Sequence, residues 1–169
     1  LGINGAYKGA SAIVIPSLCD TLKTLGENWK YAVKDIPFIP MTYPQHRKPA
    51  YGIAYTKAGY ERVIHDLEKL GGKFDAAALA ESNRIYNRHN QVMRRAEEVL
   101  ANHPEITAAQ RSDLFKSAFF MLKEEHTALV EQLIKELEGT APAAEKLPVI
   151  VSGILTDAPQ LNAIMDELG

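Results

Sequence analysis

The stretch SAIVIPSLCDTLKTLGENWKYAV, residues 11–33, decides how this chain begins to fold. Its first part, residues 11–16, is short, apolar and rich in β-branched residues, which predicts a buried strand. From Asp20 onward, apolar residues recur at steps of three and four, which predicts a helix over residues 20–34. The run IPFIPMTY, residues 36–43, predicts a second strand, although its prolines weaken the pattern. Strand, helix and strand in this order are typical of a βαβ unit with a parallel sheet.

Helical patterns dominate the middle of the chain. We expect Thr56 to cap one helix, which Gly71 and Gly72 end, and Asp75 to cap a longer one with Leu79, Ile85, Tyr86, Met93 and Leu100 along one side. Thr107 and Gln110 fit a capping box, which predicts the start of a helical stretch reaching Glu138, with room for a break.

The last part of the chain predicts a return to the sheet. LPVIVSGIL, residues 147–155, is typical of a buried parallel strand, and residues 156–168 have a helical period. The predicted fold class is therefore α/β: a Rossmann-like parallel sheet, three strands in this fragment, with a helical insertion between the second and third strands. Residues 1–55 would form the first part of the α/β domain and residues 56–140 the helical insertion. Residues 141–169 would return to the α/β domain.

Composition restricts the classes of function. The chain has 169 residues and a formal net charge of −2, so no overall positive field attracts nucleic acid or an anionic membrane. A single cysteine cannot form an internal disulfide, and no apolar run is long enough to span a bilayer. We expect a soluble cytoplasmic protein with no nucleic-acid or membrane partner. Because there is no initiator Met and the chain stops directly after a helical pattern, we expect a fragment of a longer protein.

Cys19 is the candidate functional residue of the βαβ unit. It lies with Ser17 and Asp20 between the predicted strand and helix, at the carboxyl edge of the sheet, where ligands of open α/β folds collect. A thiol at a helix N-terminus is near unpaired N–H groups, which favour the thiolate, the form that acts as nucleophile or metal ligand. The alternative is that this lone cysteine is a small buried apolar residue. Cluster binding by this segment alone is poorly supported, because iron–sulfur clusters are usually held by several thiolates.

Three stretches of the sequence resemble a known protein family. IPSLCDTLKTLGENWKYAV, then DIPFIPMTYPQHRKPAYGIAYTKAGYERVI, then AESNRIYNRHNQVMRR are similar to the second, cluster-bearing subunit of the 2-hydroxyacyl-CoA dehydratases. That group contains 2-hydroxyglutaryl-CoA dehydratase and is related to benzoyl-CoA reductase. The resemblance covers nearly the whole chain, and PSLCDTLK and NWKYAV are its most specific parts.

The resemblance implies a cofactor. Subunits of this family have Rossmann-like domains with helical insertions, and each holds a [4Fe-4S] cluster through three cysteines far apart in sequence. Cys19 matches the middle ligand, so it would be a cluster ligand in the complete subunit. The other two would lie outside this chain, and we therefore expect the isolated fragment to hold no stable cluster and to be inactive. Asp20 and the helix N-terminus would tune the cluster from the surrounding shell.

The resemblance also implies a reaction and its partners. One electron delivered to the thioester carbonyl of a 2-hydroxyacyl-CoA gives a ketyl radical anion, which expels the 2-hydroxyl; the β-proton of the resulting radical is then acidic, and the electron is returned. The enzyme would be a lyase that gives an enoyl-CoA. Its partners would be a companion dehydratase subunit and an ATP-dependent iron–sulfur activator protein, in an anaerobic cytoplasm. The alternatives are a benzoyl-CoA-reductase-like subunit and a non-catalytic binding or assembly module with the same scaffold.

Other polar residues have weaker assignments. TYPQHRKPAY, residues 42–51, contains Tyr43, His46, Arg47, Lys48 and Tyr51, which would lie on the same edge as Cys19. This basic, aromatic loop could meet the phosphates or adenine of the CoA thioester; the alternative is a solvated loop. Ser17 could bond to substrate or cluster sulfur, or act as the helix N-cap. The remaining histidines (His65, His89, His103 and His126) have no joint metal-ligand spacing, and we expect them at the surface or an interface.

Overall fold

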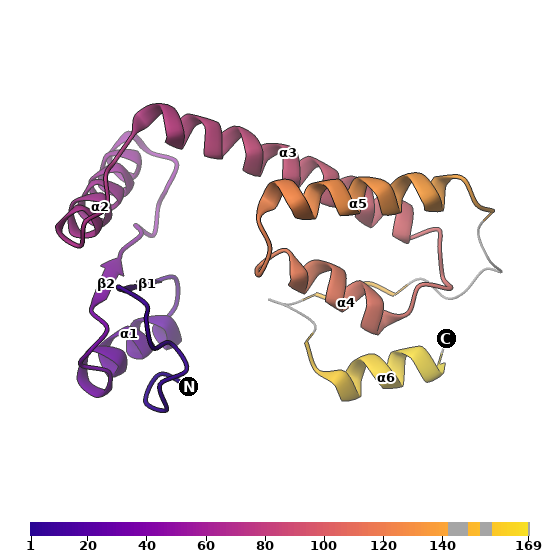
Figure 1. Cartoon of the computed structure of the whole chain (residues 1–169), viewed down its shortest axis with the longest axis horizontal. Coiled ribbons are helices and arrows are strands. Elements are labelled where there is room, and N and C mark those ends of the chain that lie inside the picture. The colour runs from indigo at the N-terminus through magenta and orange to yellow at the C-terminus, as the bar shows by residue number, and fades with distance from the viewer. Residues whose placement is uncertain (142–148, 153–156, 169) are drawn as a thin grey trace. The chain divides into compact units, whose positions relative to one another are not determined.

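The computed structural model describes residues 1–141, 149–152 and 157–168, and these fall into two units, Leu1–Asp75 and Ala76–Gly169. Figure 1 shows the elements of both units in chain order. The first unit contains strand β1 (Ile13–Pro16), helix α1 (Asp20–Ala32), strand β2 (Phe38–Met41) and helix α2 (Ala50–Lys69). The second contains helices α3 (Ala76–Leu100), α4 (Ala108–Ser117), α5 (Lys123–Glu138) and α6 (Pro159–Leu168).

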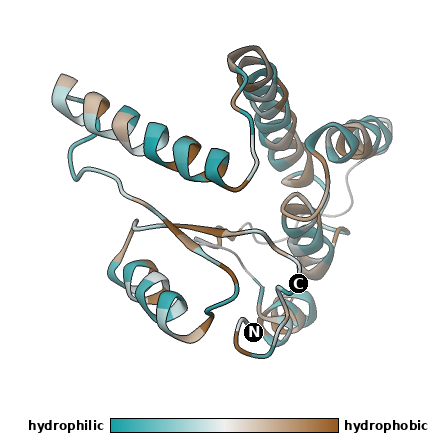
Figure 2. Ribbon diagram, turned by 60° about the vertical axis from the view of Figure 1, so that its left-hand side comes forward, coloured by the Kyte–Doolittle hydropathy of each residue, from teal (hydrophilic) through white to brown (hydrophobic). Residues whose placement is uncertain are grey.

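The predicted βαβ unit is confirmed. β1 and β2 pair in parallel, with Ile13 opposite Phe38 and Pro16 opposite Met41. α1 contacts both strands and α2 contacts β2, so each face of the small sheet has a helix against it; Figure 2 shows the hydrophobic strands between these two helices. Because residues alternate between the faces, Ile15 is buried in the core beneath α1, whereas Val14 is 37% exposed on the other face.

Trp29 organises the core of this first unit. Its ring is 7% exposed and packs with Ile15 and Ile36. Its indole nitrogen donates a hydrogen bond of 3.0 Å to the carbonyl of Ile36, which satisfies the one polar atom that the burial of tryptophan brings into a core. Of the residues that predicted the helical period, Leu22, Trp29 and Val33 lie on the face that covers the sheet, whereas Leu25 is 47% exposed.

The predicted start of the second helix is wrong. α2 begins at Ala50, with Pro49 as its N-cap, and Thr56 lies inside the helix and donates to the carbonyl of Gly52. Proline has no side-chain oxygen that could accept from the first N–H groups, so this helix begins without a side-chain cap. The backbone φ that proline fixes nevertheless suits a helix start.

The three-stranded sheet is not seen in the described residues, where the sheet has two strands. Most of the predicted third strand, residues 147–155, lies outside them. Its described part, residues 149–152, is neither helix nor strand, and Ile150 is 95% exposed. An apolar run predicts a buried strand only when neighbouring elements are there to bury it.

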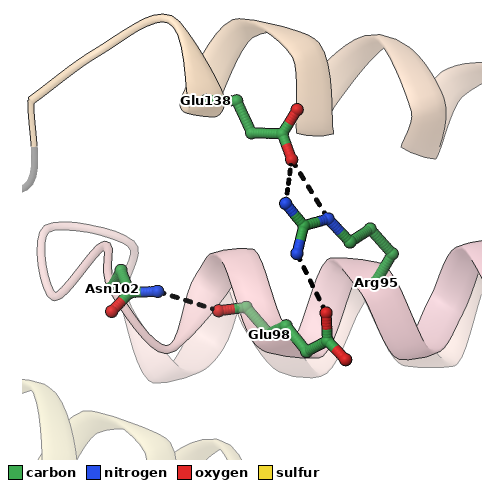
Figure 3. A network of polar contacts seen from close by, with 4 residues as sticks. All are labelled: Arg95, Glu98, Asn102 and Glu138. Atoms are coloured by element: carbon green, nitrogen blue, oxygen red, sulfur yellow. Dashed lines mark hydrogen bonds and ion pairs between the residues drawn. The ribbon is translucent and has the colours of Figure 1, made fainter.

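The second unit is built on the pair α3 and α5, which pack through Val92, Ala96 and Val130. Arg95 on α3 also pairs with Glu138 on α5 and with Glu98 on its own helix, as Figure 3 shows. The predicted capping box is confirmed: Thr107 Oγ1 accepts from the N–H of Gln110, whose side chain accepts from the N–H of Thr107. The predicted break is also present, between α4 and α5.

The predicted apolar side of α3 is only partly correct. Leu100 is buried, but Leu79 and Tyr86 are about half exposed, and the buried residues of this helix are His89, Val92, Ala96, Val99 and Leu100. Among the described residues, no helix has both the length and the apolar character needed to cross a bilayer.

The four histidines expected at the surface or an interface divide into two groups, and a surface position is wrong for three of them. His89, His103 and His126 are each at most 4% exposed, whereas His65 is exposed. Buried polar side chains need partners. His89 and His126 partner each other, with 3.0 Å between His89 Nε2 and His126 Nδ1, and His103 Nδ1 lies 2.7 Å from Glu105.

Candidate functional site at the carboxyl edge of the sheet

Cys19 is the residue at which α1 begins. Its backbone is extended, its carbonyl accepts the N–H of Lys23, and it is the N-cap of the helix without any side-chain cap hydrogen bond. The thiol is free and exposed, so the alternative of a buried apolar cysteine does not describe this structure. An exposed thiol that serves no capping role is available to bind a ligand.

Ser17 connects the two strand ends beside Cys19. Both its N–H, at 2.8 Å, and its hydroxyl, at 3.3 Å, donate to the carbonyl oxygen of Met41. The alternative of Ser17 as the helix N-cap is therefore wrong, because the cap position belongs to Cys19. The two hydrogen bonds extend the parallel pairing past Pro16 and tie the segment that carries Cys19 to the end of β2.

The loop after β2, residues 42–49, lies against α2. The hydroxyl oxygen of Thr42 accepts from Tyr55, at 3.3 Å, and from Arg62, at 3.2 Å. The Thr42 hydroxyl, which can donate to an ionised Tyr55, and the positive charge of Arg62 both favour the phenolate, and they lower the pKa of Tyr55. The first residue of the loop is thus held by two side chains of the helix.

Tyr43 makes a second set of contacts between the loop and α2. Its hydroxyl is 3.4 Å from the hydroxyl of Tyr60 and donates to the sulfur of Met41 at 3.4 Å, and its ring meets the Tyr60 ring edge to face. The hydrogen bond with Tyr60 and partial burial raise the pKa of Tyr43, while Arg47 acts in the opposite direction. The guanidinium of Arg47 lies 5.4 Å from the centre of the Tyr43 ring, which is cation–π geometry.

The structure therefore brings Tyr43 and Arg47 together and leaves His46 and Lys48 exposed in the same loop. Sequence reasoning missed Thr42, Tyr55, Tyr60 and Arg62. Tyr51, Tyr55 and Arg62 are four and seven residues apart, a spacing that places side chains on one side of a helix. This spacing could have been recognised, but the wrong helix start at Thr56 left Tyr51 and Tyr55 outside the predicted helix.

No group of three or more His, Cys, Asp or Glu side chains in the described part of the chain could hold a metal ion. Cys19 is the one cysteine of the sequence, so it can contribute one thiolate to a metal centre, and any further thiolate would have to come from outside this chain. A [4Fe-4S] cluster is compatible with this edge only if cysteines from outside this chain complete it, because a cluster needs several cysteines and this chain has one.

A groove of about 830 Å³ lies elsewhere, between α3 and α5. Four of its five charged side chains are paired with one another, Arg84 with Glu81 and Arg88 with Glu131, and Glu124 is the fifth. None of the site residues predicted from the sequence lines it. The groove therefore gives no support to a second active centre.

The fold and the site define a class: an α/β protein with an exposed thiol and a basic loop at the carboxyl edge of a parallel sheet, the loop lying against a helix that carries three tyrosines. Comparison with known proteins narrows this class to one family. The family model described as 2-hydroxyglutaryl-CoA dehydratase, D-component, matches residues 1–169. The chain belongs to this family.

Three curated relatives resemble the chain over almost its whole length. Lactoyl-CoA dehydratase subunit beta of Anaerotignum propionicum is 40% identical over 170 residues, 99% of this chain. The (R)-phenyllactyl-CoA dehydratase beta subunit of Clostridium sporogenes is 38% identical over 168 residues, and (R)-2-hydroxyglutaryl-CoA dehydratase, subunit beta, of Acidaminococcus fermentans is 35% identical over 170, each 98% of this chain. In each comparison the chain spans 45% of the relative's length.

Proposed function

We propose that the chain is the central part of an iron–sulfur subunit of a 2-hydroxyacyl-CoA dehydratase, a lyase that converts a 2-hydroxyacyl-CoA into an enoyl-CoA. One observation carries the proposal: the chain's single thiol, Cys19, is exposed at the edge where ligands bind in open α/β folds. Membership of a family whose curated relatives are named as dehydratase beta subunits supports it.

In the complete subunit, Cys19 would supply one thiolate to a [4Fe-4S] cluster whose other cysteine ligands lie outside this chain. When bound, the cluster would supply the single electron that makes expulsion of the 2-hydroxyl group possible. Ser17 has a positioning role, because its two hydrogen bonds to Met41 fix the segment in front of Cys19. Since the reaction returns its electron, it consumes no net reductant and releases only water.

The proposal includes partners. A subunit called beta has a companion, and we propose that this chain's parent subunit works with a companion dehydratase subunit and, transiently, with an ATP-dependent activator that also carries a cluster. The enzyme would work in an anaerobic cytoplasm, because reduced clusters and substrate radicals react with oxygen. The basic loop after β2, with Tyr43, His46, Arg47 and Lys48, would face the CoA part of the substrate.

The test measures iron and acid-labile sulfide per chain on the complete subunit, purified without oxygen with its companion, in three forms. We expect a full cluster in the unaltered protein and in Thr21→Ala, an exposed substitution in the first turn of α1 that keeps the thiol. Cys19→Ala should lose or degrade the cluster of this subunit. If the unaltered protein stays free of iron where a known cluster protein reconstitutes, the proposal is wrong.

A further inference from the structure

Three amide side chains follow one another along the groove between α3 and α5. Asn83, Asn87 and Gln91 of α3 all line this groove, and we call them the amide row. Steps of four residues place them on the same side of the helix, about 6 Å apart along its axis. All three are exposed, and none has a hydrogen-bond partner within the part of the chain that the structure describes. Asparagine is a poor residue for a helix interior, so the stability of α3 does not explain this row.

Helix α5 forms the other wall of the groove. The two helices lie side by side (Figure 1) and run parallel, because Arg88 bonds to Glu131 and Arg95 to Glu138 with the same separation of 43 residues. The α5 residues that line the groove include Ala128, whose side chain is small and exposed. The groove is therefore open along the amide row.

The charges of the groove restrict what it can bind. Arg84 pairs with Glu81 and Arg88 pairs with Glu131, so these four charges cancel. The fifth charged residue of the lining, Glu124, has no ion pair among the described residues. One negative charge is left, and it lies at the start of α5. The groove thus disfavours anionic ligands and accepts a neutral chain with a basic side chain at one end.

An extended polypeptide matches the spacing of the amide row. In an extended chain, every second residue turns its N–H and C=O to the same side, and two residues rise about 6.7 Å. A side-chain amide has both a donor and an acceptor, so each member of the row can bond to both backbone groups of one residue. From Ala80 to Gln91 the groove runs about 16 Å along α3, which is the length of about five extended residues.

We propose that the amide row binds the backbone of an extended segment of the companion dehydratase subunit, about five residues long, with Lys or Arg at the end that meets Glu124. The inference rests on the proposed function, which includes the companion, and gives that subunit a docking surface. Relatives named as beta subunits support a companion of this kind. Hydrogen bonds to the main chain supply the affinity, and the pairing with Glu124 fixes the direction of the segment.

The first experiment measures the Kd between the complete subunit and its companion by biolayer interferometry. Asn83→Ala, Asn87→Ala and Gln91→Ala should each raise the Kd about fivefold, the effect of one lost net hydrogen bond. Alanine is the better helix residue, so the Tm of these variants should not fall, which separates lost binding from lost folding. Ala128→Phe should raise the Kd more than about fiftyfold, because its ring occupies the place of the segment.

Gln132→Ala is the matched control. Gln132 is an exposed amide of α5 that donates to Glu136 and does not line the groove. Its loss should change the Kd by less than about twofold, because no contact with the companion is removed. Unchanged affinity in the three amide-row variants and in Ala128→Phe would overturn the inference.

A photo-cross-linking amino acid in place of Ala128 identifies the occupant of the groove. Cross-links to the companion subunit support the inference, and mass spectrometry then gives the cross-linked segment. A peptide with the sequence of that segment should compete with the companion. The same peptide with methyl groups on alternate backbone nitrogens should not, because it lacks the donors that the amide row needs. Cross-links to a second copy of the subunit, or to another part of the same chain, contradict the inference.

Iron measured in the same samples separates the two proposals. A full cluster in a subunit whose companion binds independently of the amide row overturns this inference and leaves the dehydratase proposal intact. Companion binding that depends on the amide row, in a protein that stays free of iron, supports the inference and contradicts the dehydratase proposal.

Discussion

Gly52 is the residue on which the loop after β2 depends most directly. The atom that a side chain would meet there is the carbonyl oxygen of His46, part of the backbone, and at 2.0 Å it cannot be accommodated without moving the loop or the helix. At Gly59 the corresponding distance, to Thr42, is 3.2 Å, which a small adjustment relieves. The two glycines look alike in sequence, and only the fold distinguishes them.

We therefore predict that Gly52→Ala destabilises the protein by about 1–3 kcal/mol, the usual cost of forcing an extra methyl group into a packed site. Gly59→Ala should be close to neutral, because the strain is small and alanine favours the helix by about 1 kcal/mol over glycine. Urea unfolding followed by Trp29 fluorescence measures both. Equal effects of the two substitutions would contradict the proposed packing of the loop on α2.

At the scale of elements, the packing of α3, α4 and α5 includes a buried chain of polar groups. His126 Nε2 lies 3.1 Å from the carbonyl of Leu114, which can only accept, so this nitrogen carries the hydrogen. His126 Nδ1 is then an acceptor, and His89 Nε2 donates to it at 3.0 Å. His89 Nδ1 is left as a bare, buried acceptor without a partner among the described residues.

This arrangement explains why the pKa of His89 is lowered. Burial is the main cause, and the positive charge of Lys123 adds to it. The charge of His126 acts in the same direction, and hydrogen bonding to Asn90 acts against them without cancelling the shift. The neutral form of His89 is therefore the one that the folded helices accommodate.

A pH dependence follows, and its sign can be worked out. Because the pKa of His89 is lower in the folded than in the unfolded state, the unfolded state binds more protons below about pH 6.5, the ordinary value. The free energy of unfolding should fall as the pH decreases from about 6.5, by at most about 1.4 kcal/mol per pH unit from this group. Helix content followed in urea titrations at several pH values measures this slope.

The variant that isolates the effect is His89→Gln, whose amide can still donate to His126 but does not titrate. We expect it to reduce the slope between pH 6.5 and pH 5. His65→Gln is the control, because His65 is exposed, and it should leave the slope unchanged. An unaltered slope in His89→Gln would mean that the buried pair has no part in acid sensitivity.

At the scale of the whole molecule, each unit has its own core cluster. Ile15, Trp29 and Ile36 belong to the first unit, and Val92, Ala96 and Val130 to the second. The chain has one tryptophan, so its fluorescence reports on the first unit alone, whereas far-UV circular dichroism reports on both units and draws its larger share from the four helices of the second.

We predict that Val130→Ala lowers the stability of the second unit by about 2 kcal/mol, from the loss of two buried methyl groups and the cavity they leave. The midpoint seen by circular dichroism should shift while the fluorescence midpoint stays. Ile15→Ala should do the reverse, moving the fluorescence midpoint by a loss of about 2–5 kcal/mol. A coincident shift of both signals in either variant would mean that the two units unfold as one.

The elements that could be predicted from the sequence are those whose signals are local. β1 and β2 follow from short apolar runs and α1 from an apolar period of three to four residues, and the capping box at Thr107 needs only Gln110, three residues away. The position of Cys19 at the start of α1 has the same local origin, and so has the place of the basic loop directly after β2.

Tertiary structure decided what depends on residues far apart in sequence. It set the start of α2 at Ala50, joined Thr42 to Arg62, and buried His89 against His126, 37 residues away. The described part of the predicted third strand, residues 149–152, is not a strand, because strand pairing is a contact between distant segments and is not encoded in one apolar run. Local periodicity determined which segments of this protein are helices and strands, whereas long-range packing determined which polar side chains meet.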